Sequence, residues 1–205
     1  MTTGEVVHIV EDDASMRASL ARLLGGAGYE LRLFASAEEF LEVISPELAG
    51  CALVDLRLSG MSGLELQERL IGRGCLLPVV FLTAHGDLPD GVRAMKRGAV
   101  DFLEKPVAAD ALFGAIATAL ARDAVARRSR DELADLAARA ARLTQRERQV
   151  WLRVVRGQLN KQIAFDLGIV ERTVKLHRAA AMTKLGAASL ADMVLAAEKL
   201  GVIGG

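Results

Sequence analysis

The first half of the chain alternates short, mostly apolar runs with segments of helical periodicity. These runs predict buried strands over residues 6–10, 30–34, 51–55, 79–82 and 100–103, and three of them, at 6–10, 51–55 and 79–82, lead into polar residues. Between and after them, apolar residues recur at steps of three and four, which predicts helices near residues 15–27, 63–71 and 89–97 and from residue 108 onward. Ser36 and Glu39 have the spacing of a capping box at the start of one more helix. Regular alternation with short connections predicts an α/β fold with a doubly wound parallel sheet of five strands.

One long helix is predicted over residues 108–143, because this stretch is rich in Ala and Arg and has few helix breakers. Its first turns carry apolar residues that we expect to pack on the sheet, namely Leu112, Phe113, Ile116 and Leu120. Farther along, further apolar residues return at helical steps, namely Leu133, Leu136, Ala140 and Leu143. The pattern favours a helical linker over residues 123–141 that could pair with a second chain, with a flexible charged linker as the alternative.

Short helices dominate the end of the chain. Thr144 and Glu147 form a capping box, and two helices over residues 160–167 and 171–178 flank a turn that contains Gly168. Apolar residues spaced to hold this pair together are Ile163, Ala164, Leu167, Ile169 and Val174. Such a pair predicts a helix-turn-helix whose second helix enters a DNA major groove; a solvated basic helix in a bundle is the alternative.

Composition excludes several classes of protein. No apolar run among the 205 residues approaches the roughly 20 residues of a membrane span. The first residues lack the basic and apolar regions of a secretion signal. Cys51 and Cys75 stand in apolar surroundings without metal-ligand spacing. We therefore expect a cytoplasmic protein with buried thiols, no membrane association, no disulfide and no zinc.

Charge is divided unevenly, although the formal net charge is zero. Residues 1–122 contain 11 Lys and Arg against 17 Asp and Glu, whereas residues 123–205 contain 15 against 9. A basic second half suggests contact with a polyanion such as nucleic acid, although Arg on helices often only forms a solvated face.

Acidic residues that could form a functional site lie at the ends of the predicted strands. Glu11 and Asp12 follow the first strand, and Asp55 ends the third. The carboxyl ends of parallel strands meet at one edge of a sheet, and crowded carboxylates need a cation. Mg²⁺ fits best, because it prefers carboxylates, waters and phosphate oxygens. Acids at a helix N-terminus are the simpler explanation for Asp13 and need not exclude the metal role of its neighbours.

Two further residues would reach the same edge. Lys105 follows the last strand and can hold a phosphate as a point charge, while Thr83 offers a hydroxyl. Pro106 fixes the turn after Lys105 and can adopt the cis form. An acid cluster, a hydroxyl and a lysine are what a carboxylate needs in order to accept a phosphoryl group.

This motif set resembles the receiver domain of two-component response regulators, a CheY-like fold, over residues 4–122. The resemblance implies that Asp55 is the phosphoacceptor and that Glu11, Asp12 and Asp55 serve Mg²⁺. It also implies that Thr83 and Lys105 hold the phosphoryl oxygens. Phe102 would be an aromatic switch residue that turns inward with Thr83, and an ordinary core aromatic is an equally weighted alternative. Residues 83–102 are similar to the FixJ branch in particular.

Some positions depart from the family pattern or tune it. Ser59 stands where receivers commonly have proline, so we expect a more mobile loop. Glu11 stands where many receivers have Asp, which lengthens its reach to the metal. Arg57 and His85, each two residues after a site residue, flank the path of an attacking water in this family and would set the lifetime of the phosphoryl group.

Residues 142–203 resemble the LuxR-type helix-turn-helix domain of the FixJ/NarL family, an all-α fold. The segments that carry this resemblance include residues 143–147, 160–164, 172–177 and 182–185. The predicted DNA-binding residues are Lys161, Arg172, Thr173, Lys175, Leu176, His177 and Arg178. The resemblance implies that the final helix, near residues 190–200, mediates dimerisation on DNA.

Together these features predict a DNA-binding response regulator that a sensor histidine kinase phosphorylates and that then forms a homodimer and regulates transcription with RNA polymerase. By this reading the chain is not an enzyme, apart from its own phosphotransfer and autodephosphorylation. One alternative is an orphan regulator that binds DNA without phosphorylation. A phosphohydrolase with an aspartyl intermediate is less favoured, since such enzymes need an acid where Arg57 stands.

Overall fold

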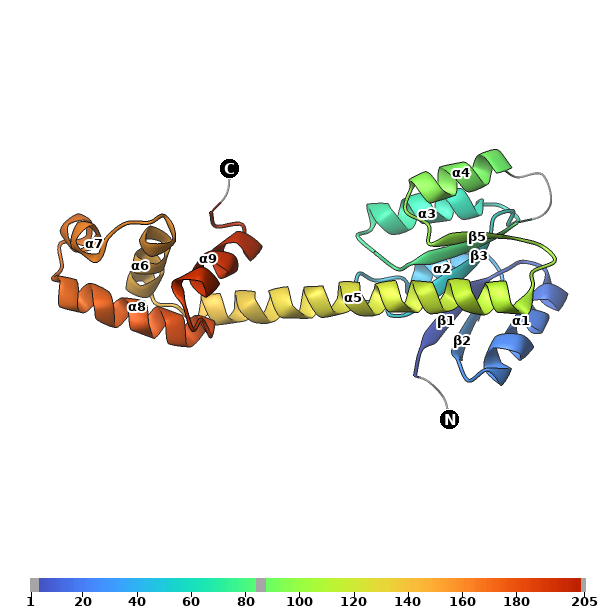
Figure 1. The fold of residues 1–205 in the computed structure, drawn as a ribbon. Helices are drawn as coiled ribbons and strands as arrows, with labels where there is room; N and C mark the ends of the chain where they lie inside the picture. Colours follow the sequence, from blue (N-terminus) through green and yellow to red (C-terminus); the bar gives the residue numbers. More distant parts are fainter. Residues whose placement is uncertain (1–3, 84–87, 204–205) are drawn as a thin grey trace. The chain divides into compact units, whose positions relative to one another are not determined.

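The chain forms two compact units, Met1–Ala126 and Arg127–Gly205, in a computed structural model that describes residues 4–83 and 88–203. The first unit contains a parallel five-stranded sheet of order β2-β1-β3-β4-β5 (Figure 1). Its strands are β1 (Val6–Val10), β2 (Glu30–Phe34), β3 (Cys51–Asp55), β4 (Val79–Thr83) and β5 (Asp101–Glu104). Its helices are α1 (Ala14–Gly26), α2 (Ala37–Val43), α3 (Gly63–Gly72), α4 (Leu88–Lys96) and the first part of α5 (Ala109–Ala141).

Helices cover both faces of this sheet. Successive strand residues point to opposite faces, so each buried strand feeds two cores. In β3, Ala52 and Val54 pack toward α2, α3 and α4, whereas Cys51 and Leu53 pack toward α1 and α5. All five residues of β3 are buried, as expected for a central strand covered on both sides. The predicted doubly wound α/β class is confirmed.

Most predicted boundaries agree with the structure to within a residue or two. Helix α1 ends at Gly26, one residue before the predicted end. The turn comes at Gly28, whose φ of 94° lies in the left-handed region that glycine alone adopts readily. The peptide bond between Lys105 and Pro106 is cis.

The second unit is helical throughout its described part. It contains α6 (Gln145–Val155), α7 (Asn160–Leu167), α8 (Glu171–Leu185) and α9 (Leu190–Lys199). Trp151 lies at the centre of the core and donates a hydrogen bond from Nε1 to the Met193 carbonyl, at 3.1 Å. Ile163 and Val174 are fully buried and join α7 to α8, as the spacing predicts. The helix predicted over residues 171–178 is longer, because α8 continues to Leu185 and ends at left-handed Gly186.

Helix α5 is continuous and supplies core residues to each unit. Leu112 and Ile116 are buried against the sheet, and Leu136 is buried in the helical core. Within the described residues, no single helix has both the length and the apolar character needed to cross a membrane. The pair α8 and α9, bent by 60°, passes that test only on length and composition.

Candidate functional site

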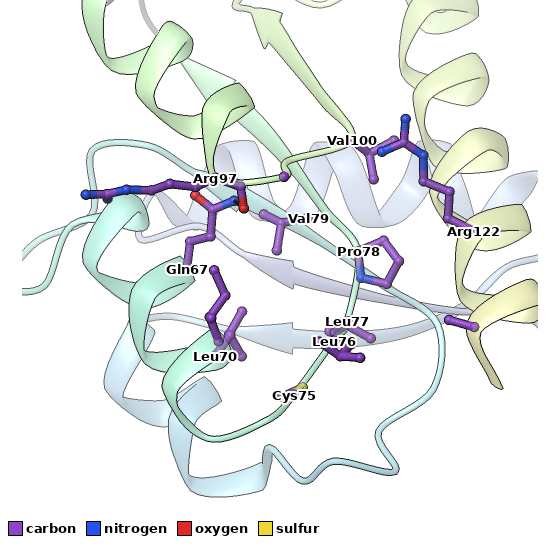
Figure 2. A pocket seen from close by; sticks show the side chains of 13 residues that line it. Gln67, Leu70, Cys75, Leu76, Leu77, Pro78, Val79, Arg97, Val100 and Arg122 are labelled. Atoms are coloured by element: carbon purple, nitrogen blue, oxygen red, sulfur yellow. Dashed lines mark hydrogen bonds between the residues drawn. The ribbon is translucent and has the colours of Figure 1, made fainter. Parts of the chain in front are cut away.

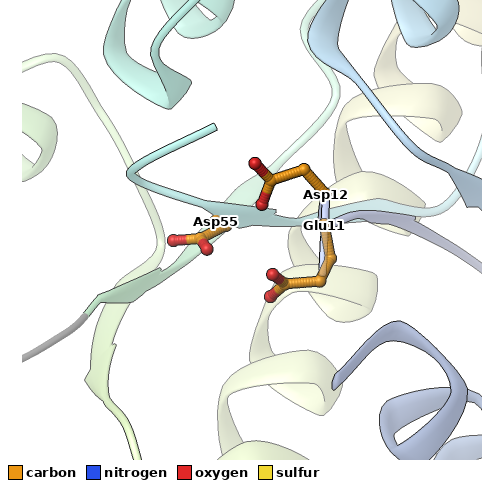
Figure 3. Close-up of side chains that lie close together, drawn as sticks. All are labelled: Glu11, Asp12 and Asp55. Atoms are coloured by element: carbon orange, nitrogen blue, oxygen red, sulfur yellow. The ribbon is translucent and has the colours of Figure 1, made fainter. Parts of the chain in front are cut away.

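Four strands deliver polar side chains to one edge of the sheet. Glu11 directly follows β1, Asp55 ends β3, Thr83 ends β4 and Lys105 directly follows β5. The strands are parallel, and β3 pairs with both β1 and β4, so their carboxyl ends lie side by side. Figure 3 shows Glu11, Asp12 and Asp55 gathered there. Fold topology therefore assembles a site from residues that are far apart in the sequence.

The three carboxylates form a tight cluster. One oxygen from each of Glu11, Asp12 and Asp55 lies within 4.8 Å of the others. Lys105 Nζ donates to Glu11 Oε2 and to Asp55 Oδ2, each at 2.8 Å. Three carboxylates and one ammonium leave a formal charge of −2, which a divalent cation would neutralise.

Burial makes the charges of this cluster interact strongly. Desolvation raises the pKa of Glu11, and the hydrogen bond from Lys105 only partly offsets that rise. Desolvation by itself would lower the pKa of Lys105, but its hydrogen bonds to Asp55 and Glu11 outweigh it, so the pKa is raised. Lys105 is therefore a fixed positive charge beside Asp55.

Asp12 is held by the loop that follows β3. The Ser59 amide and hydroxyl both donate to Asp12 Oδ2, at 3.0 and 2.5 Å. The hydroxyl hydrogen bond is the main reason that the pKa of Asp12 is lowered. Whereas the missing proline predicts a more mobile loop, the structure ties this loop to the cluster. The sequence carries no local sign of this pairing, because the two residues are 47 positions apart.

A second unpredicted residue supports the backbone of the cluster. Arg17 Nη1 donates to the Glu11 carbonyl at 2.5 Å and to the Asp12 carbonyl at 3.3 Å. Its place one turn into α1, just after an acidic strand end, is the only local signal for this role.

The cluster suits a hard divalent cation. It opens into a cavity of about 490 Å³ that is also lined by Asp13, Ser15, Met16, Ser19 and Lys105. Carboxylate oxygens beside an open cavity, lined mainly by charged residues and serines, match the preference of Mg²⁺ for a few carboxylates and several waters. The residues present therefore fit a metal site at the predicted position.

Thr83, Phe102 and Arg57 are the other predicted residues of the first unit that the structure describes. Thr83 is 2% exposed. The Phe102 ring is partly buried and packs against the core. The Arg57 amide donates to Asp55 Oδ1 at 3.1 Å, and its side chain is exposed. The predicted tuning residue His85 lies outside the described residues.

In the second unit, α8 presents a basic surface. Arg172, Lys175 and Leu176 are exposed, Leu176 to 63%. Thr173, His177 and Arg178 are partly buried. Successive residues of a helix point in different directions, so these neighbours cannot all be fully exposed on one face. Lys161, at the start of α7, is also exposed.

Comparisons with known proteins agree with both halves of this description. Residues 7–117 match the response regulator receiver domain, and residues 141–197 match the bacterial regulatory proteins of the luxR family. The transcriptional regulatory protein FixJ of Azorhizobium caulinodans is 45% identical over 196 residues, which cover 96% of this chain and 93% of FixJ. Nodulation protein W of Bradyrhizobium diazoefficiens is 42% identical over 201 residues, 98% of this chain and 88% of that protein. The chain belongs to the FixJ-type response regulators.

Solved structures support the assignment of this regulator. The response regulator StyR is 47% identical and superposes with a TM-score of 0.85, covering 96% of this chain and all of StyR. Full-length FixJ from B. japonicum is 41% identical with a TM-score of 0.60 over the whole of both chains. The chain is thus a DNA-binding transcription regulator of a two-component system, and its family implies a sensor kinase as partner.

The regulator has another hollow, away from the acid cluster. A cavity of about 230 Å³ lies at the amino ends of β4 and β5, between α3, the end of α4 and α5 (Figure 2). Its walls are mostly apolar, with Leu70, Leu77 and Pro78 among them. No carboxylate lines it, so it is not part of the candidate site.

Proposed function

We propose that phosphorylation of Asp55 by a sensor histidine kinase controls how this regulator binds DNA and regulates transcription. The observation that carries the proposal is the Asp55 carboxylate at the end of β3, 2.8 Å from Lys105 Nζ and clustered with Glu11 and Asp12. An isolated carboxylate is a weak nucleophile toward a phosphate, since both carry negative charge. Positioning and neutralisation are what make the transfer feasible.

The transfer is a simple displacement. An Asp55 carboxylate oxygen forms a P–O bond while the P–N bond of the kinase phosphohistidine breaks. The electron pair of that bond stays on the imidazole nitrogen, which takes up a proton. Glu11, Asp12 and Asp55 would hold Mg²⁺, which neutralises phosphoryl oxygens when it is bound. Lys105 would pair with one transferred oxygen, and the Thr83 hydroxyl would donate to another.

The acyl phosphate would then be lost to water. Arg57 stands beside Asp55, and we propose that its side chain, together with His85, sets how long the phosphoryl group survives. An acid at position 57 would activate water and make the site a hydrolase, whereas an arginine cannot act as that base. The phosphohydrolase alternative is accordingly less well supported.

Phosphorylation would be transmitted through Thr83 and Phe102 to the face formed by α4, β5 and α5. Val92 and Met95 on α4 are 48% and 45% exposed, which supports a surface that becomes buried in a homodimer. The phosphoryl group must bind one arrangement of this face better than the other, because otherwise no population shifts.

In the dimer, α8 of each chain would enter a major groove of promoter DNA. Arg172, His177 and Arg178 would mainly contact phosphates, while Lys175 and Leu176 would meet base edges. Lys161 would add a phosphate contact from α7. On α9, Leu190 and Leu195 are 45% and 51% exposed, which supports pairing of the two DNA-bound domains. The regulator would act in the cytoplasm, where promoter DNA and RNA polymerase are.

Mass spectrometry and footprinting of the full chain test this function. After incubation with acetyl phosphate and Mg²⁺, we expect one added phosphoryl group on Asp55, a larger dimer fraction and stronger footprints. Asp55→Asn should abolish all three changes. An unlabelled Asp55 would overturn the proposal, and unchanged footprints and transcription in D55N would support a regulator that works without phosphorylation.

A further inference from the structure

Ser59 joins the loop after β3 to the acid cluster through two hydrogen bonds. Its amide and hydroxyl converge on the same atom, Asp12 Oδ2, at 3.0 and 2.5 Å. Two donors on one oxygen hold the carboxylate plane against rotation, which a single hydrogen bond would allow. The loop therefore fixes the direction in which Asp12 faces the cluster.

Asp12 is the least buried of the three carboxylates in the cluster. Glu11 and Asp55 share the Lys105 ammonium at 2.8 Å each, and Glu11 is only 1% exposed. Asp12 has no ion pair with Lys105 and is only partly buried, so solvent competes for it. Without Ser59 its side chain would lose entropy on binding a cation, and the affinity would fall.

From this geometry we propose that Ser59 is a positioning residue for the metal site, which holds the Asp12 carboxylate oriented for a divalent cation. The inference rests on the proposed metal role of Glu11, Asp12 and Asp55. Hydrogen-bonded partners of ligating carboxylates commonly change metal affinity by about 10–100-fold when they are removed. A charge-assisted bond at 2.5 Å is at the strong end of such contacts.

Direct metal binding tests the proposal without reference to phosphorylation. Mn²⁺ serves as the probe, since electron paramagnetic resonance reports the free ion, and Mg²⁺ competition gives the affinity for the smaller ion. The full chain is compared with Ser59→Ala, which keeps the amide donor and loses the hydroxyl, and with Ser59→Thr, which keeps both. Ser45→Ala removes a hydroxyl elsewhere in the same unit and serves as the control.

We expect Ser59→Ala to weaken Mn²⁺ and Mg²⁺ binding by about tenfold, with Ser59→Thr and the control close to the unaltered chain. Circular dichroism and the urea midpoint show whether each variant is folded. A loss of less than about threefold for folded Ser59→Ala, or a gain, overturns the proposal, since the hydroxyl would then be neutral or would compete with the cation.

Failure of the metal site itself has a different signature. If the unaltered chain shows no saturable Mn²⁺ binding, then the cluster is not a metal site and the inference about Ser59 falls with it. If the unaltered chain binds Mn²⁺ and Asp12→Asn abolishes binding while Ser59→Ala does not, only the positioning role is refuted. Both outcomes are read from Mn²⁺ binding alone. Phosphoryl transfer to Asp55 is measured in a separate experiment, so its failure is distinguishable from theirs.

Discussion

Single residues in the receiver carry constraints that come from their neighbours in space. An ideal Cβ on Gly91 of α4 would lie 2.7 Å from Cζ of Phe102, so glycine lets the ring rest against the helix backbone. His8 of β1 is fully buried beside Phe34 and Phe40, and its Nε2 donates a hydrogen bond to the Ala49 carbonyl, 3.0 Å away. Gly91 therefore affects the position of the Phe102 ring, and the buried His8 affects how stability depends on pH.

Gly91→Ala should displace the Phe102 ring and destabilise the receiver, even though alanine favours helices by about 1 kcal/mol over glycine. In a Phe102→Ala background the same change should cost at least about 1 kcal/mol less, because the clash is gone. Urea unfolding of the two single variants and the double variant measures this coupling. Strictly additive effects would show that the ring does not occupy this position.

Stability should fall as the solution is acidified through the titration of His8. Burial lowers the pKa of His8, so the unfolded chain takes up a proton at about pH 6.5 while the folded chain does not. Full stability is therefore expected above pH 6.5, with a loss of about 1.4 kcal/mol per pH unit between that value and the lowered folded pKa. Urea unfolding followed by circular dichroism should show this slope.

His8→Leu is the comparison for that pH dependence. The raised pKa of Glu11 acts in the opposite direction, but Glu11 is present in both proteins and cancels in the difference. The variant should lose most of the slope just below pH 6.5. An identical slope would mean that His8 is protonated in the folded state.

At the scale of elements, helix ends fix the packing of the second unit. Arg139 in the last turns of α5 donates from Nη1 to the Leu185 carbonyl at the end of α8, at 2.8 Å. Gly186 follows with φ 70°, and an ideal Cβ there would lie 2.5 Å from Arg139 Nη1. Cations are favourable at the carbonyl end of a helix, so α5 contributes a C-terminal cap to α8. The last turns of α5 are thus part of the helical core.

Arg139→Ala should destabilise the second unit by about 1–2 kcal/mol, since a partly exposed charged donor is lost from the end of α8. Trp151, the only tryptophan in the chain, reports unfolding of this unit by its fluorescence. Arg142→Ala, which removes an exposed arginine just beyond α5, should leave the transition unchanged. Equal effects of the two variants would assign the loss to net charge rather than to the cap.

At the scale of the whole molecule, charge separates the two units. Residues 1–126 contain 11 Lys and Arg against 18 Asp and Glu, and residues 127–205 contain 15 against 8. The acidic unit holds the cluster around Asp55, and the basic unit holds α8. A polyanion is therefore attracted to the unit that carries the helix-turn-helix.

DNA binding should weaken steeply with salt, because each phosphate contact releases counterions. Lys161→Ala and Arg172→Ala should each reduce the slope of log affinity against log salt by roughly 1. Titrations of promoter DNA between about 50 and 200 mM salt measure it. Arg128→Ala removes the same charge from α5, outside the proposed DNA surface, and should leave the slope unchanged. A slope lowered equally by Arg128→Ala would place the DNA elsewhere.

The sequence by itself determined the class of fold, the strand ends that carry Glu11, Asp55 and Thr83, and the capping box at Thr144. These features depend on periodicity and on residues a few positions apart, which a single segment specifies. Only the tertiary structure decided that Ser59 holds Asp12 and that Arg139 caps α8. Such contacts join residues 47 and 46 positions apart. Their partners are chosen by how whole elements pack, and no local pattern encodes that choice.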